Sequence, residues 1–260
     1  EVGLDKDSMQ KLIGNGGELQ ADICASIQRL SVSNQFADEE VASSYVYPSG
    51  YKVRGITEQT NRLRELFSGI GTANEKLAEQ PLPPGAEGWF AIPRWEKLAP
   101  TYNEAVEKVL ALIAASRKFT NYREGHLGPD RLRQHARKVG MFQTLGDQQR
   151  KHDILIVPAQ FGLRHRGRSV RRAREVFAAN ELGLGAYEVG IMLLMYPERL
   201  VHYDNLWIDC AGDEYHDPAG ARAFSRAPCF GFCDGVLGFG ADWFAYADAD
   251  FGSASGFVSQ

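Results

Sequence analysis

The strongest constraint on the fold is a succession of strand, helix, helix and strand between residues 153 and 210. Residues 153–157 (DILIV) form a short apolar run, which is typical of a buried strand. Ser169 can cap a helix over 169–180, and a second helix is expected over 186–195. Residues 206–210 form the next strand. Because crossover connections usually return to the same sheet, we expect the two strands to be parallel or close neighbours in one sheet.

The C-terminal region predicts an antiparallel hairpin. Asp234 and Gly235 lie between the strand-like residues 228–233 and 236–239, and an Asp-Gly pair in this position favours a two-residue turn. Residues 243–247 can add a third strand. The chain therefore predicts an α/β, or α+β, fold with a mixed sheet, a crossover unit and a C-terminal antiparallel hairpin.

The N-terminal portion is expected to be mostly helical. Residues 18–30 and 57–68 carry apolar side chains at helical spacing. The prolines of 81–84 then indicate a linker or a rigid crossing. The predicted organisation is a helical region over 1–80 and an α/β domain over 85–260, with a single domain as the alternative.

The middle of the chain predicts a strand and two helices. Residues 89–92 read as a strand, and a capping box at Thr101 and Glu104 begins a helix over 102–113. A second helix is expected over 129–139, where proline stands in the first turn. Its basic side chains are expected to form a solvated face: Arg131, Arg133, Arg137 and Lys138.

Composition excludes several classes of protein. The net charge of −4 argues against a surface devoted to nucleic acid, although 81–200 carry a net +7 and 201–260 a net −7. Four cysteines are too few for a disulfide scaffold, so buried free thiols are expected. The strongest apolar stretch, 189–196, is too short to span a membrane, and a cytoplasmic protein with no membrane partner is expected. Neither a complete dinucleotide fingerprint nor a P-loop occurs, and the small residues of 252–256 predict a flexible tail.

The candidate site is an arginine-rich segment of residues 164–174, which carries six arginines in eleven residues. A helix N-terminus offers free N–H donors and favours anions, whereas cations there are unfavourable by about 0.3–1 kcal/mol each. We therefore expect a negative partner, and the principal hypothesis is a phosphate-containing ligand, either a nucleotide or a nucleic acid. The predicted ligand contacts are Arg164, Arg166, Arg168, Ser169, Arg171 and Arg172.

An acidic cluster after the strand at 206–210 leaves three interpretations open. Asp209, Asp213 and Glu214 could hold Mg²⁺ for phosphoryl transfer or phosphodiester hydrolysis, with Asp209 and His165 as catalytic residues. The same acids could instead pair with the arginines inside a structural or accessory protein. The arginines could also dock on an acidic protein partner. Whether the chain is an enzyme stays open at this point.

Overall fold

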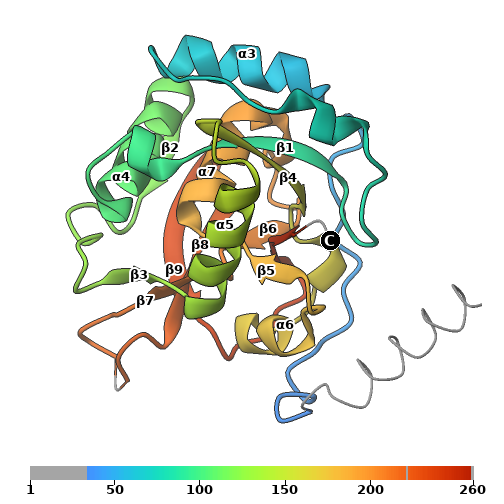
Figure 1. Ribbon diagram of the computed structural model, residues 1–260. Helices are drawn as coiled ribbons and strands as arrows, with labels where there is room; N and C mark the ends of the chain where they lie inside the picture. The colour runs from blue at the N-terminus through green and yellow to red at the C-terminus, as the bar shows by residue number, and fades with distance from the viewer. Residues whose placement is uncertain (1–33, 221, 259–260) are drawn as a thin grey trace, which may run out of the picture. The chain divides into compact units, whose positions relative to one another are not determined.

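Two β-sheets organise the unit of residues 36–260. The computed structural model describes residues 34–220 and 222–258 (Figure 1). The predicted helical spacing at 18–30 therefore lies outside the described residues. No helix in the described part of the chain is long and apolar enough to cross a membrane.

The smaller sheet has four strands in the order β1-β4-β11-β5, and all of its pairings are antiparallel. Its strands are β1 (Gly88–Pro93), β4 (Ile154–Gln160), β5 (Glu181–Gly183) and β11 (Ser255–Phe257). Strand β4 is buried along its whole length, and β1 and β11 pair with its two edges. This explains its uninterrupted apolar sequence.

The larger sheet has seven strands and mixed pairing. Its main path runs β10-β6-β8-β7-β3, while β9 pairs with β8 and with β2. The β10–β6 and β2–β9 pairs are parallel. The strands are β2 (Phe119–Asn121), β3 (Leu132–Gln134), β6 (Trp207–Asp209), β7 (Asp213–Tyr215), β8 (Arg226–Cys233), β9 (Val236–Trp243) and β10 (Phe251–Ser253).

Helix α7 (Ala186–Met195) lies at the centre of the core, because every one of its residues is buried. It packs against α4 and β1, and the absence of a side chain at Gly190 makes room for Val109 of α4. Figure 1 shows α4 to the left of it and α5 in front of it. The other helices are α3 (Ile56–Leu66), α4 (Tyr102–Ser116), α5 (Ala136–Gln148) and α6 (Val170–Val176), with short 3₁₀ turns η1 (Glu75–Glu79), η2 (Trp95–Lys97), η3 (Leu163–His165) and η4 (Pro197–Arg199).

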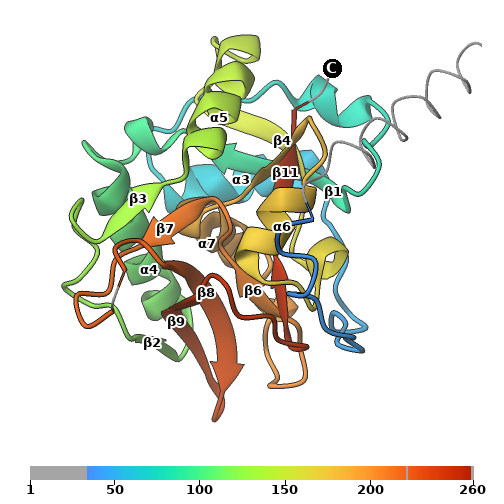
Figure 2. The ribbon, with the colours of Figure 1, turned by 90° about the horizontal axis from the view of Figure 1, so that it is seen from below.

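The structure confirms the α/β class and the C-terminal hairpin. Strands β8 and β9 pair antiparallel around Asp234 and Gly235, whose φ angles of 52° and 75° are those of the predicted turn (Figure 2). Helix α7 has the predicted bounds, and α4 begins with the predicted capping box at Thr101. Strands β4 and β6, however, lie in different sheets, because β1 and β11 occupy both edges of β4.

Three local predictions are wrong. Residues 129–139 do not form one helix: 132–134 pair with β7, and α5 begins at Ala136, where the ring of His135 accepts a hydrogen bond from the N–H of Arg137. The third strand at 243–247 does not form, since β9 ends at Trp243. Residues 252–256 are not a tail, because they belong to β10 and β11 and are buried.

Candidate functional site

Two residues of the arginine-rich segment, Arg166 and Arg168, form isolated β-bridges to two other parts of the chain. Residues 36–47, called the strap below, bridge to Arg168 through Glu40, and the N–H of Val41 donates to the carbonyl of Gly167. On the other side, Arg166 bridges to Gly252 of β10. The segment is therefore built into the fold.

Glutamates of the strap engage the arginines at the start of α6. Arg171 pairs with Glu39, while Arg168 and Arg172 lie 3.2 and 2.5 Å from Glu40. The remaining guanidinium groups also have partners: Arg164 with Glu181, Arg166 with the carbonyl of Tyr45, Arg172 also with Glu175, and Arg174 with the carbonyls of Ala211 and Asp213. The negative partner expected at this helix start is thus supplied largely by the strap.

Ser169 is the N-cap of α6, as predicted. Its hydroxyl accepts from the N–H of Arg172 at 3.1 Å and donates to Glu39 at 2.6 Å. The residue is fully buried. The cap therefore also anchors the strap.

His165 lies in an internal network behind the arginines. Its Nδ1 accepts a hydrogen bond from the guanidinium of Arg168, because arginine can only donate. Its Nε2 therefore carries the ring proton and donates a hydrogen bond of 2.7 Å to Glu181. Burial lowers the pKa of His165, while Glu181 opposes that change. Burial alone would raise the pKa of Glu181, but the hydrogen bonds from His165 and Ser255 hold it at about 2. The neutral ring is thus held inside the protein.

The structure does not bring the three predicted metal ligands together. Adjacent strand residues point to opposite faces, so Asp213 is buried while Glu214 faces Arg133 and Arg174. Asp209 lies on β6, where burial, followed by the neighbouring Asp242, raises its pKa to about 8. Within the described residues, no group of three or more His, Cys, Asp or Glu side chains could hold a metal ion.

A buried charge network occupies the N-terminus of α7. The Nζ of Lys138 lies 2.7 Å from Glu188, 3.1 Å from Asp213 and 2.8 Å from the hydroxyl of Tyr102. The Tyr102 hydroxyl donates to Asp213 at 2.6 Å. The side chains of Lys138, Glu188 and Asp213 are 1%, 2% and 0% exposed, so the network is buried.

Backbone groups at the start of α7 complete this network. The N–H of Gly185 donates to Glu188 at 2.9 Å, and that of Ala186 donates to Asp213 at 2.8 Å. Both carboxylates thus lie at the positive end of the helix, where negative charge is favourable. Glycine is favoured at position 185, because a Cβ there would collide with the side-chain ends of Lys138 and Asp213.

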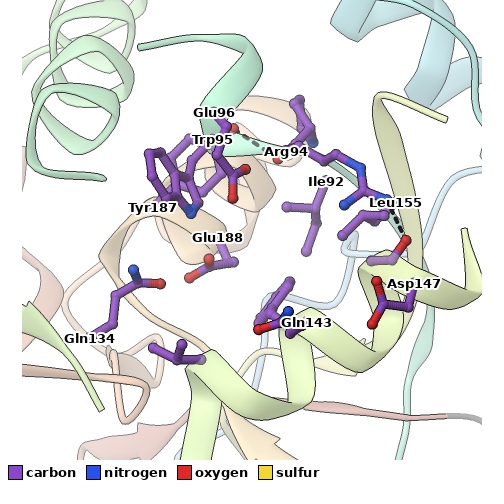
Figure 3. A pocket seen from close by; sticks show the side chains of 14 residues that line it. Ile92, Arg94, Trp95, Glu96, Gln134, Gln143, Asp147, Leu155, Tyr187 and Glu188 are labelled. Atoms are coloured by element: carbon purple, nitrogen blue, oxygen red, sulfur yellow. Dashed lines mark hydrogen bonds between the residues drawn. The ribbon is translucent and has the colours of Figure 1, made fainter. Parts of the chain in front are cut away.

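One face of this network borders a cavity of about 350 Å³ between β1, α5 and α7. We call it the α5–α7 cavity. Figure 3 shows the side chains of Glu188, Gln134 and Gln143 directed into it, with Trp95 and Glu96 on the opposite side. Its remaining lining residues are Ile92, Pro93, Arg94, Val139, Phe142, Gly146, Asp147, Leu155 and Tyr187.

The α5–α7 cavity is acidic because the three carboxyl groups of its lining, those of Glu96, Asp147 and Glu188, outnumber the single guanidinium group of Arg94. Arg94 donates to the carbonyls of Gly146, Gln149 and His152 at 2.6, 3.1 and 2.8 Å. Its guanidinium group therefore caps carbonyl groups at the C-terminal end of α5. In contrast, Glu96 and Asp147 form no ion pair with any described residue. Burial raises the pKa of Glu188, and although Lys138 opposes this, Asp213 adds to it.

Sequence reasoning missed the α5–α7 cavity because it placed Lys138 on a solvated face. One signal was available: Gly185 followed three residues later by Glu188 is a capping pattern that places a carboxylate at a helix start. Nothing in the sequence placed Lys138 beside that carboxylate, since the contact depends on the packing of α5 on α7.

The fold and the α5–α7 cavity define an α/β protein with two sheets and an acidic small-molecule-sized pocket at the start of its central helix. Comparisons with protein-family models, with curated proteins and with solved structures found no match.

Proposed function

We propose that the chain binds a small organic cation, such as an alkylamine or guanidine compound, in the α5–α7 cavity. The observation that carries this proposal is the charge of the lining: Glu96, Asp147 and Glu188 contribute carboxyl groups, while Arg94 is engaged by backbone carbonyls. An ammonium or guanidinium group would pair with these carboxylates, whereas an anion would be repelled.

Size and apolar surface support the same class of ligand. A volume of about 350 Å³ lies at the small end of ligand pockets, which run from roughly 300 to 1,000 Å³. Trp95 and Phe142 line the cavity, and aromatic faces attract cations by about 0.5–2 kcal/mol. Gln134 and Gln143 add hydrogen-bonding groups to the lining.

The phosphate-binding hypothesis at the arginine-rich segment stays a prediction, as does its Mg²⁺-dependent version. The contacts of that segment favour the alternative of internal pairing, because strap glutamates engage Arg168, Arg171 and Arg172. On this view the arginines fasten the strap to α6. They would then contribute to stability rather than to ligand binding.

Calorimetric titration of the full chain with three compounds of similar length tests the proposal. Putrescine, 1,4-butanediol and succinate carry two positive charges, none and two negative charges. We expect putrescine alone to bind, and to bind at least tenfold more weakly when Glu96→Gln and Asp147→Asn remove two carboxylates. Glu79→Gln, at an exposed glutamate outside the lining of this cavity, is the matched control and should bind as the wild type does.

Two results would contradict the proposal. One is an absence of putrescine binding to a folded wild-type protein. The other is equal affinity of the wild type and the double variant, since the site would then lie elsewhere.

A further inference from the structure

The network below the α5–α7 cavity lacks one positive charge. With every group in its usual ionic state, Glu188 and Asp213 bring two negative charges, and Lys138 brings the one positive charge that contacts both carboxylates. The guanidinium of Arg174 donates instead to the backbone carbonyl of Asp213 and pairs with Glu214. An uncompensated buried charge is strongly unfavourable, and the helix N-terminus offsets only a part of that cost. The network therefore needs another proton or another cation.

Glu188 is the place where that positive charge can enter. Both oxygens of Asp213 are already engaged, Oδ1 by Lys138 and Oδ2 by Tyr102 and the N–H of Ala186. Glu188 uses Oε2 for both Lys138 and the N–H of Gly185, and its side chain lines the cavity. Only this carboxylate connects the buried network to a space that a ligand can occupy.

We propose that Glu188 is protonated when the α5–α7 cavity is empty and releases that proton to solvent when an ammonium ligand binds. This inference rests on the proposed function and adds a mode of regulation. The O–H bond of Glu188 breaks, its proton passes to the buffer, and the ligand retains its own protons. The ligand cation then supplies the charge that the proton supplied before.

The groups around Glu188 are compatible with this exchange. Burial and Asp213 favour its neutral form, and Lys138 alone opposes them strongly, which leaves the pKa of Glu188 raised. The titratable and charged groups that face Glu188 are Lys138 from α5, Asp213 from β7, Tyr102 from α4, Cys210 after β6, Tyr187 from α7 itself, and Arg94, Glu96 and Asp147 around the cavity. Because Glu96 and Asp147 also place carboxyl groups beside the cavity, the test must separate their contribution to binding from that of Glu188.

Titration of putrescine at pH 5–8, in pairs of buffers with different ionisation enthalpies, counts the protons released. We expect about one proton released per ligand at the acid end of the range, and an affinity that rises by about tenfold per pH unit there. Glu188→Gln should abolish the release, whereas Glu96→Gln and Asp147→Asn should each weaken binding and retain it. The infrared spectrum of the ligand-free wild type should show the carbonyl band of a protonated carboxyl group, and this band should disappear on saturation with putrescine. This measurement needs no variant.

The outcomes separate this inference from the proposed function. Putrescine binding without proton release at any pH, or release that persists in Glu188→Gln, would overturn the inference and leave cation binding intact. A protonated-carboxyl band unchanged by saturating putrescine would do the same. A complete lack of putrescine binding would overturn the proposed function, and the inference with it.

Discussion

Replacing Lys138 with methionine should destabilise the protein severely, although methionine nearly conserves the volume. The substitution leaves Glu188, Asp213 and the hydroxyl of Tyr102 without the ammonium group that lies 2.7–3.1 Å from each of them. Removing one partner of a buried ion pair costs about 3–5 kcal/mol. Since about 1 kcal/mol shifts Tm by roughly 2–4 °C in a chain of this size, Tm should fall by about 6–20 °C.

Thermal and urea unfolding of the full chain measure this effect. Lys52→Met, at an exposed lysine, is the control and should unfold within about 0.5 kcal/mol of the wild type. Adding Asp213→Asn to Lys138→Met should restore much of the loss, because the carboxylate left without its ammonium partner becomes a neutral amide. An unchanged midpoint for Lys138→Met would refute the reasoning, since the buried network would then contribute nothing to stability.

Three further predictions concern other parts of the fold. Gly185→Ala should cost about 1–3 kcal/mol in urea unfolding, because its Cβ would collide with Lys138 and Asp213, and an unaltered stability would show that this helix start is not tightly packed. Asp209→Asn should leave the free energy of unfolding near pH 4 unchanged and raise it by up to about 5 kcal/mol at pH 9. The neutral form of Asp209 stabilises the wild type below the unfolded pKa near 3.8, and this stabilisation is lost as the pH rises through the folded pKa of about 8. Parallel pH profiles of the wild type and the variant would contradict this prediction. Arg171→Met should lower the free energy of unfolding by about 1 kcal/mol and speed proteolysis of the strap near Glu39. An unchanged cleavage rate would argue against a role of Arg171 in holding the strap on α6.

Local signals in the sequence were sufficient for several elements. The capping box at Thr101, the glycine before Ala186 and the Asp234-Gly235 turn each fix backbone geometry within a few residues, and each is present in the structure. Strand β4 was also evident, since a strand buried on both faces has little choice but to be apolar. These features depend on near neighbours, so no knowledge of the packing was needed.

The features that were missed depend on distant contacts. Glu39 and Glu40 lie about 130 residues before their arginine partners, so spacing could not pair them. Residues 252–256 carry almost no apolar signal, yet they are buried because Ser255 donates to Glu181 and accepts from Gln160. Lys138 resembles any surface lysine until β3 pairs with β7 and α5 packs on α7.

Assignment of the tryptophan indole N–H resonances during a putrescine titration tests the central claim most directly. Trp95 lines the α5–α7 cavity, whereas Trp243 ends β9 in the other sheet. Binding in the cavity predicts a saturable shift of the Trp95 resonance with putrescine, none with 1,4-butanediol, and a Trp243 resonance that does not move. A saturable shift at Trp243 with an unmoved Trp95, or equal responses to the diamine and the diol, would contradict cation binding at this site.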